Sequence, residues 1–348
     1  MAKKTTDNKN KRNFLSHNFF YFSLFFIIFS IIGVVFIFLQ KNRTKKLDNV
    51  KVSLSWLHQA QFAGIYTAIE KEYYKEVGLE VQLEDFEFDK ELEQDLADGK
   101  TDFSITHADR LLESISKGLD IKAVAAIYQI SPHSILLPKD LFLSPQDLVG
   151  KILGVKGGNT SGKLLYSVIL ANFGIDAEDV TFKSLDFTTS EFEDIERGSI
   201  DMVDLYRTDQ VYEFVKNDYD FQLFVPENFR FKTYGDVIAT SDQMIKNKPA
   251  IVKSFVEATL KGWEYALDNP EEALSFTEKY INNKQYQDKS YNRFILENSA
   301  PMIRLEEYQS IGEMNTNTWA RLYNAMKLNN LVDQDFQIED AFTLQFIQ

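Results

Sequence analysis

The sequence predicts an α/β protein, in which a mainly parallel sheet is covered by helices on both faces, preceded by one membrane-spanning helix. Two patterns predict the fold class. Strand and helix patterns alternate from Val50 to Tyr206, whereas almost only amphipathic helices follow Lys246. A third pattern, a long apolar run near the start of the chain, predicts the membrane helix.

The apolar run is "FFYFSLFFIIFSIIGVVFIFL", Phe19 to Leu39, and it contains no charged residue and no proline. At about 1.5 Å per helical residue it spans roughly 30 Å, the thickness of a bilayer's hydrocarbon core. The residues that follow, Gln40 to Arg43, offer no small-x-small cleavage site, so a retained signal anchor is favoured over a cleaved signal peptide. We expect a cytoplasmic basic N-terminus at 1–18, a transmembrane signal anchor at 19–39 and a linker at 40–49.

Charge predicts where the main domain lies. The first 46 residues hold nine Lys or Arg and one Asp, so the rest of the chain is more acidic than the net charge of −14 for the whole sequence. An acidic body argues against binding to nucleic acid and against docking on anionic lipid. We therefore expect a single-pass protein of the cytoplasmic membrane whose main domain faces the periplasm or the cell exterior.

The first strand and helix meet at a corner rich in aromatic and polar side chains. "KVSLSWL" alternates as a strand, "QFAGIYTAIEKEYYKEVG" has helical spacing and ends at Gly78, and "LEVQLEDFEF" alternates again. Two aromatics, a histidine and two amides lie between Trp56 and Phe62. Small ligands bind at the carboxyl ends of strands in open α/β sheets, so this corner predicts a pocket.

The remaining elements follow the same alternation up to Tyr206. We expect these elements, in order: helix, turn and strand at 91–105, a helix at 107–118, a strand at 120–130, a strand and glycine-rich corner at 147–160, a helix at 161–174, a strand at 180–186, a helix and strand at 191–206, and helices at 249–281, 290–303 and 315–330.

Four stretches carry a family resemblance when they are taken together. "WLHQAQFAGIYTAIEKEYYKEVGLEV", "DLADGKTDFSITHADRLLESISKGLDIKAVAAIYQ", "DLVGKILGV" and "ERGSIDMVDLY", in this order, resemble the NMT1/THI5-like solute-binding proteins over about 50–331. The resemblance implies a type II periplasmic-binding-protein fold (Venus flytrap) with two lobes, 50–135 plus 235–348 and 136–234. It places the chain crossings near 134–139 and 231–236.

The resemblance also implies a function. It predicts capture of a small molecule, with a thiamine-pyrimidine-like precursor favoured over other small polar solutes, for uptake by an ABC permease. An alternative is a ligand-sensing input domain that works with a membrane signalling partner, which a retained membrane helix favours. Enzymatic activity is the least favoured hypothesis, because the related fungal pyrimidine synthases carry a cysteine-rich motif and this chain has no Cys. We expect no cofactor.

The candidate ligand contacts come from strand ends. Trp56 and Phe62 could stack on a planar ring, and Asp204 could accept from an amino group. The competing interpretations are ordinary packing for the aromatics, helix capping for "THADR", a surface acid for Asp204 and an ordinary turn for "TYGD". The predicted ligand-binding residues are Trp56, His58, Phe62, Tyr66, His107, Asp109, Gln129, Gly158, Asn159, Thr160, Asp204, Tyr206 and Tyr234.

Two other kinds of site are disfavoured by spacing. The glycine-rich "GVKGGNTSGK" is not a nucleotide-phosphate loop, since Lys163 is followed by Leu164, although its N–H groups could bind a polar ligand edge. His58 has no second histidine at a metal-binding spacing, and His107 and His133 are isolated in the sequence. We therefore predict no metal site.

Overall fold

The computed structural model describes residues 47–88, 90–141, 144–156, 167, 170–171, 173–186, 190–307 and 310–347. The predicted signal anchor at 19–39 and the glycine-rich corner at 157–160 lie outside these residues. Within the described part of the chain, no helix has both the length and the apolar character that crossing a bilayer requires.

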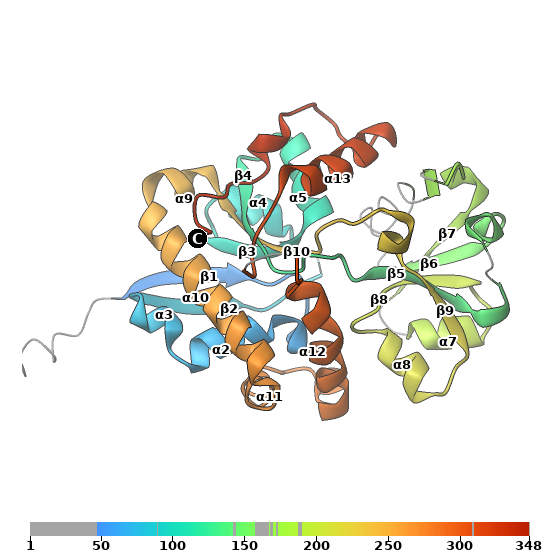
Figure 1. The fold of residues 1–348 in the computed structure, drawn as a ribbon, viewed down its shortest axis with the longest axis horizontal. Coiled ribbons are helices and arrows are strands. Elements are labelled where there is room, and N and C mark those ends of the chain that lie inside the picture. The colour runs from blue at the N-terminus through green and yellow to red at the C-terminus, as the bar shows by residue number, and fades with distance from the viewer. Residues whose placement is uncertain are drawn as a thin grey trace, which may run out of the picture. The chain divides into compact units, whose positions relative to one another are not determined.

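Two five-stranded sheets organise the described residues (Figure 1). The first has the strand order β2-β1-β3-β10-β4 and the second the order β7-β6-β8-β5-β9. The strands of the first sheet are β1 (Asp48–Ser53), β2 (Leu79–Glu84), β3 (Phe103–His107), β4 (Ile121–Ala126) and β10 (Asp236–Ser241). Those of the second are β5 (His133–Pro138), β6 (Ile152–Lys156), β7 (Thr181–Leu185), β8 (Met202–Tyr206) and β9 (Phe221–Phe224).

The helices are placed by the connections between strands and by the C-terminal part of the chain. The α-helices of the first sheet's lobe are α2 (Ala63–Glu70), α3 (Tyr73–Glu76), α4 (Leu92–Ala97), α5 (Ala108–Ser116), α9 (Asp242–Asn247), α10 (Pro249–Asp268), α11 (Pro270–Thr277), α12 (Lys289–Ile303) and α13 (Thr316–Leu328). The second sheet carries α7 (Glu191–Glu196) and α8 (Val211–Lys216). Short 3-10 turns include η1 (Ala60–Phe62), directly after β1, and η6 (Lys284–Tyr286), before α12.

Both sheets are mixed, whereas the sequence pattern predicts a mainly parallel sheet. β1 pairs in parallel with β2 and β3, and β6 pairs in parallel with β7 and β8. However, β10 runs antiparallel to β3 and β4, and β5 runs antiparallel to β8 and β9. The reason is that β5 and β10 are the first strands after each crossing of the chain between the sheets, and no crossover helix precedes them to restore a parallel direction.

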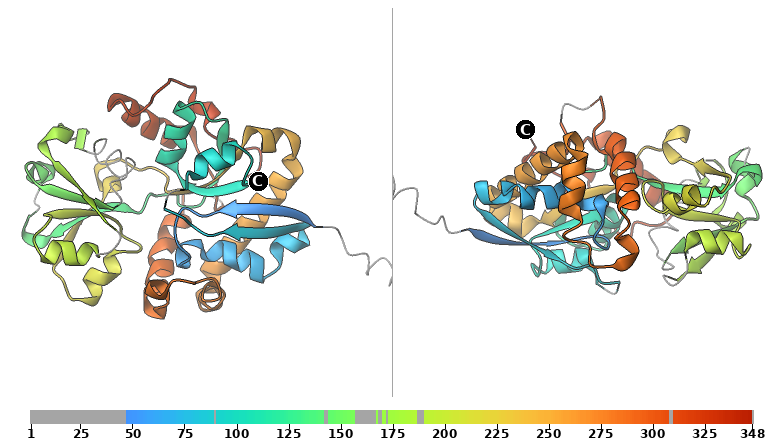
Figure 2. Two further views of the ribbon diagram at one scale, coloured as in Figure 1. Left: turned by 180° about the vertical axis from the view of Figure 1, so that it is seen from behind. Right: turned by 90° about the horizontal axis from the view of Figure 1, so that it is seen from below.

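The two faces of the first sheet are buried against different helices, as the opposed views of Figures 1 and 2 show. Ile238 of β10 belongs to a core shared with α2, α10 and α12, and its neighbours Val237 and Ala239 belong to a core shared with α4, α5 and α13. Neighbouring residues belong to different cores because successive side chains of a strand point to opposite faces of the sheet. A strand buried on both faces reads as a continuous apolar run, not as an alternating one.

Helices α2 and α10 approach each other closely through glycine. A Cβ added at Gly262 would lie 2.2 Å from the carbonyl oxygen of Gly64, and one added at Gly64 would lie 2.2 Å from the Trp263 ring. Side chains larger than hydrogen cannot occupy these positions without separating the helices. The pair thus holds α2, and with it the corner before α2, firmly on the lobe.

The predicted helix at 61–78 is interrupted in the structure. It divides into η1, α2 and α3, with Glu72 between α2 and α3 in a left-handed conformation (φ 59°). This break turns Tyr74 into the core, where its ring stacks on Phe255 and its hydroxyl lies 2.7 Å from that of Thr259. Gly78 ends the segment with a positive φ of 89°, as predicted.

The chain crosses between the sheets at 127–132 and returns at 225–235. The first crossing is earlier than the sequence-based placement at 134–139, because those residues form β5 of the second sheet and its exit. The two crossings hydrogen-bond to each other, Gly235 N–H to the Tyr128 carbonyl (3.0 Å) and Ser131 N–H to the Thr233 carbonyl (2.8 Å). We call residues 47–126 and 236–347 lobe 1 and residues 133–224 lobe 2.

Candidate functional site

Buried polar residues of both lobes meet directly after β1 and β8. The Gln59 side chain, after β1 in lobe 1, donates a hydrogen bond of 2.9 Å to Asp209, after β8 in lobe 2. Tyr291 of α12 donates its hydroxyl to the other carboxylate oxygen of Asp209. These three residues form what we call the latch, which joins lobe 1 to lobe 2.

The latch is supported by the start of α12. Asn292 accepts a hydrogen bond from the Ala60 N–H (2.9 Å) and donates to the Tyr286 carbonyl (2.6 Å), so it fixes the corner after β1 against η6 and α12. Tyr212 of α8 packs its ring against Tyr291, with centroids 5.4 Å apart. Contacts between the lobes are therefore made by residues that lobe 1 already holds in place.

A second group of polar residues, which we call the histidine cluster, lies where the lobes are joined. It consists of His107 at the end of β3, Asp109 at the start of α5, His133 at the start of β5, Asp204 and Tyr206 at the end of β8, and Asp236 at the start of β10. The Tyr206 ring lies 4.4 Å from the His133 ring and 5.6 Å from the His107 ring, between centroids. His133 Nδ1 lies 3.0 Å from Asp204 Oδ1.

Gln61 connects the latch to the histidine cluster. Its amide nitrogen donates to Asp236 (2.7 Å), and its amide oxygen accepts from the Gln59 amide (3.0 Å). A continuous chain of hydrogen bonds thus runs from Asp209 through Gln59 and Gln61 to Asp236. Because Ile127 and Tyr128 both donate their N–H groups to the Asp236 carbonyl, the same residue also holds the first crossing.

Several polar atoms of the histidine cluster are buried and have no hydrogen-bond partner among the residues that the structure describes. They are Asp109 Oδ2, Asp236 Oδ1 and the Tyr206 hydroxyl, and the nearby Gln129 Oε1 shares this condition. The distance from Asp236 Oδ1 to His107 Nε2 is 3.5 Å, longer than a hydrogen bond. Buried polar atoms in native proteins are nearly always satisfied, so these atoms indicate a position at which another molecule binds.

Burial controls the charge of these groups. It raises the pKa of Asp236 to about 7 and that of Asp209 to about 6, although hydrogen bonds from Gln61, and from Tyr291 and Gln59, act in the opposite direction. Burial also raises the pKa of Asp109 and lowers that of His107 well below its usual value. For His133, burial lowers the pKa, but the carboxylates of Asp204, Asp109 and Asp236 together outweigh that effect, and the net shift is upward.

The aromatic and histidine residues predicted from the first corner form a separate group in lobe 1. His58 Nδ1 lies 2.8 Å from the Tyr66 hydroxyl, and Tyr66 stacks on Tyr280 with centroids 4.5 Å apart. Phe62 is buried in the core of lobe 1. Trp56 is half-buried, and its indole N–H donates to the hydroxyl of Tyr286 (3.3 Å).

The other predicted site residues fall into three groups. His107, Asp109, Asp204 and Tyr206 come together in the histidine cluster. Tyr234 is buried against Trp319 and its hydroxyl accepts the Asn315 N–H (2.8 Å), while Gln129 donates its side-chain amide to the carbonyls of Ala126 (2.7 Å) and Glu313 (2.9 Å). Gly158, Asn159 and Thr160 lie outside the described residues. Ligand contact by all these residues stays a prediction.

Comparison with known proteins identifies the family. The model of the "NMT1/THI5 like" family matches residues 59–273, from the latch residue Gln59 into α11. The chain belongs to the NMT1/THI5-like family. This confirms the resemblance found in the sequence, and the matched range includes Gln61, Asp109, Asp204 and Asp236, whereas Tyr291 of the latch lies beyond it.

Individual relatives and solved structures are similar to this chain over most of its length. The chain is 26% identical over 314 residues to the riboflavin-binding protein RibY of Chloroflexus aurantiacus, covering 88% of each chain. It is 26% identical over 333 residues to the formylaminopyrimidine-binding protein of Halalkalibacterium halodurans, covering 92% of this chain and 98% of the relative. The periplasmic aliphatic sulphonate binding protein SsuA of Escherichia coli superposes with a TM-score of 0.66 at 14% identity, covering 84% of this chain and 91% of SsuA. The two-lobed periplasmic-binding-protein fold is thereby confirmed.

The structure adds residues of this NMT1/THI5-like protein that sequence reasoning missed. Gln59, Gln61, His133, Asp209, Asp236 and Tyr291 all belong to the latch or the histidine cluster. A signal was present for the two glutamines, which stand two residues apart directly after a strand. Nothing local marks Tyr291 or Asp209, because each acquires its role from a contact across the lobes.

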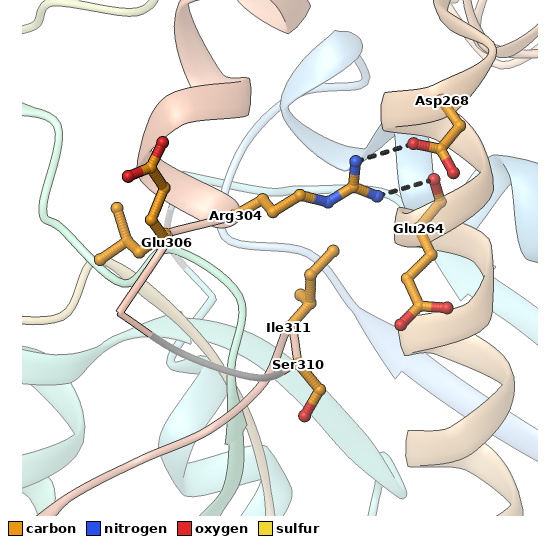
Figure 3. A pocket seen from close by; sticks show the side chains of 7 residues that line it. Glu264, Asp268, Arg304, Glu306, Ser310 and Ile311 are labelled. Carbon is orange, nitrogen blue, oxygen red and sulfur yellow. Dashed lines mark hydrogen bonds and ion pairs between the residues drawn. The ribbon is translucent and has the colours of Figure 1, made fainter.

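A metal centre and a surface pocket are the two other kinds of site to compare with the histidine cluster. In the described part of the chain, no group of three or more His, Asp or Glu is arranged to hold a metal ion. A surface pocket of about 400 Å³ lies beside α10 and is lined by Glu264, Asp268, Arg304, Leu305, Glu306, Ser310 and Ile311. Figure 3 shows the side chains that line it. Among the lining residues the one cation is Arg304, which already donates to Asp268 (2.7 Å) and to the Glu264 carbonyl (3.3 Å). None of the predicted ligand contacts lines this pocket.

Proposed function

We propose that this protein is a solute-binding protein of an ABC-type import system, which closes two lobes on a small nitrogen heterocycle, a thiamine-pyrimidine-like precursor being favoured. The observation that carries the proposal is the histidine cluster, where strand ends of both lobes supply buried polar atoms that have no hydrogen-bond partner within the described part of the chain. Closure of two lobes about a hinge is an established way to enclose a small solute.

Two features support this solute class. The relatives named above are named for binding riboflavin and formylaminopyrimidine, both nitrogen heterocycles. The cluster offers aromatic faces at Tyr206, His107 and His133 beside the carboxylates of Asp109, Asp204 and Asp236. A planar ring with amino groups would use both kinds of contact. We propose a binding protein and not an enzyme, since these relatives are named as binding proteins and the sequence has no Cys for the motif of the fungal synthases.

We further propose that residues 19–39 anchor the protein in the cytoplasmic membrane with the body outside. The length and apolar composition of that run support this, as does the acidic body that follows it. Fusions of alkaline phosphatase and of green fluorescent protein to the C-terminus test the orientation. An active phosphatase and a dark fluorescent protein are expected, and the reverse pattern would refute it.

A sensory role is the second candidate, and the apolar run at 19–39 is the observation that favours it. An import protein and a sensory input domain would bind solute in the same way but differ in their partner. Affinity purification of the tagged full chain from its native membrane separates the two. Recovery of a permease supports import, and recovery of a kinase or cyclase would replace import by sensing.

The solute itself is tested by native mass spectrometry of the full chain purified in detergent, followed by thermal-shift titration with aminopyrimidines, thiamine, sulphonates and nitrate. A ligand that binds only the folded protein stabilises it by about 2.7 kcal/mol at a hundredfold excess over Kd. We expect a shift with an aminopyrimidine that Gln61→Ala and Asp204→Asn abolish, whereas the exposed Glu257→Gln control retains it. No bound mass and no shift with any solute would refute the proposal.

A further inference from the structure

Two carboxylates of the histidine cluster, those of Asp109 and Asp236, are short of positive charge. Asp109 and Asp236 are buried, with side chains at least nine-tenths inaccessible, and within the described residues neither forms an ion pair with Lys or Arg. The two arginines next to cluster residues form their ion pairs elsewhere, Arg110 with Glu93 (3.2 Å) and Arg207 with Glu227, although the charge of Arg110 also acts on Asp109. Buried carboxylates normally have a directly bonded cationic partner, and the described residues provide none for Asp109 or Asp236.

The histidines supply only part of this charge. His133 pairs with Asp204, its Nδ1 lying 3.0 Å from that carboxylate, and it acts on Asp109 and Asp236 through its charge and not through a hydrogen bond. His107 lies 3.5 Å from Asp236, but burial favours its neutral form by lowering its pKa. A neutral imidazole next to Asp236 leaves the carboxylate oxygen Oδ1 both buried and without a hydrogen-bond partner.

Both unpartnered carboxylate oxygens belong to one small region. The carboxylates of Asp109 and Asp236 each act electrostatically on His133 and on Tyr206, whose own hydroxyl is unpartnered as well. The carboxylate of Asp109 accepts hydrogen bonds from backbone N–H groups at the start of α5, and that of Asp236 accepts one from the Gln61 side chain. Each carboxylate therefore presents one fixed oxygen and keeps the other available.

We infer that the solute presents a positively charged nitrogen group, an amidinium or a protonated heterocyclic amine, which pairs with Asp236 and Asp109. This inference rests on the proposed function and specifies the charge of its solute. Two carboxylate oxygens and a hydroxyl oxygen accept hydrogen bonds from a planar N–H group, and the His107, His133 and Tyr206 rings lie beside it. Hydrogen bonds between charged partners are the stronger kind, which gives such a group an advantage over its neutral counterpart.

Proton release should accompany binding of such a cation. Burial raises the pKa of Asp236 to about 7, and a positive charge beside it favours the ionised carboxylate. The groups facing Asp236 that could also titrate or contribute charge are His107, His133, Asp109, Asp204, Tyr128 and Tyr206. A variant at Asp236 isolates its own proton from theirs.

The test compares benzamidine, which is a planar cation, with benzamide, its neutral counterpart, by isothermal titration calorimetry on the full chain in detergent. We expect benzamidine to bind about 10- to 100-fold more tightly than benzamide, and Asp236→Asn to weaken benzamidine by a similar factor while changing benzamide by less than about threefold. Titrations in buffers of different ionisation enthalpy should show proton release that Asp236→Asn removes. Asp176→Asn, an exposed Asp of lobe 2, should leave all values unchanged.

The outcomes separate this inference from the proposed function. Three outcomes overturn the inference and leave the import proposal standing. They are equal affinity for benzamide and benzamidine, an equal loss of affinity for both in Asp236→Asn, and binding, in the thermal-shift titration, of a solute that is neutral when bound. If neither probe and no library solute binds to protein with a normal unfolding transition, both are overturned. Circular dichroism of Asp236→Asn confirms that the variant is folded in each case.

Discussion

Replacing Asp236 by Asn should make the protein more stable at neutral and alkaline pH. In the folded chain, burial raises the pKa of this carboxyl group from 3.8 to about 7, because the charged form is taken out of water and the hydrogen bond from Gln61 only partly compensates. A difference of about 3 pH units corresponds to about 4 kcal/mol of unfolding free energy once the group is ionised in both states. Asn can accept the same hydrogen bond from Gln61 and never ionises.

The direction follows from proton binding. The folded state holds the Asp236 proton more tightly than the unfolded state, so this group contributes most to stability below about pH 4, and the contribution is lost as the pH rises toward about 7. The difference in unfolding free energy between Asp236→Asn and the unmodified protein should therefore be close to zero at about pH 4 and grow to about 4 kcal/mol at about pH 8. Other buried acids, such as Asp209, titrate in both proteins and cancel in the difference.

Urea unfolding of the full chain in detergent, followed by tryptophan fluorescence at a series of pH values, measures this difference. Asp176→Asn removes an exposed carboxyl group instead and should give a difference that is small at every pH. A difference for Asp236→Asn that does not change with pH would show that Asp236 is not buried as the structure has it. A variant less stable than the unmodified protein at about pH 8 would contradict the assigned sign.

Three further predictions concern the scaffold. Tyr291→Phe removes a latch hydrogen bond worth about 1.5–3 kcal/mol and should enlarge the radius of gyration that small-angle scattering measures in the absence of solute. The control Tyr323→Phe, whose hydroxyl contacts only lobe 1, should leave the radius of gyration unchanged. Gly235→Ala places a Cβ 2.9 Å from both Pro132 and Tyr128 and should lower stability by about 1–3 kcal/mol in chemical denaturation, and an unchanged midpoint would refute a tight hinge. Gly262→Ala should lower Tm through the α2–α10 contact, and calorimetry showing an equal or higher Tm would contradict that packing.

Local sequence signals predicted the elements that form between neighbouring segments. The strand at β1, the strand at β2 and the stop at Gly78 follow from alternation and from a glycine with positive φ. The break at Glu72 could not be predicted in this way, because no Gly or Pro marks it. It exists because Tyr74 packs on α10, and that helix begins more than 170 residues later in the chain.

The missed strands show the same limit of local pattern. β5 is a short apolar run, "ILL", between His133 and Pro138, and a run this short is compatible with a connection as well as with a buried strand. Its position between β8 and β9 decides the matter, since both of its edges are paired. As a result, the first chain crossing was placed at 134–139 and not at 127–132, and the lobe boundary was placed too late with it.

Part of the candidate site could be predicted because its residues lie at the ends of strands. His107, Asp109, Asp204 and Tyr206 follow strand ends, and strand ends of parallel pairs gather at one edge of a sheet. Asp236 gave no such signal for ligand contact, because it begins an antiparallel strand and its neighbour Gly235 suggested a hinge or an ordinary turn. Its importance depends on burial, which a single sequence does not display.

Asp236 is the residue at which a loss of stability argues most directly for a function, because its carboxyl group is buried. A buried carboxyl group with one unpartnered oxygen destabilises a fold, and an Asn at this position would keep the contact with Gln61 without that penalty. The fold does not need the charge either, because the Asp236 backbone carbonyl, not its side chain, holds the first crossing through Ile127 and Tyr128. Groups that lower stability while adding nothing to the scaffold are retained where activity requires them. If Asp236→Asn proves both more stable at about pH 8 and weaker for a cationic solute, the two effects together will have one cause, a carboxylate that serves ligand binding at the expense of stability.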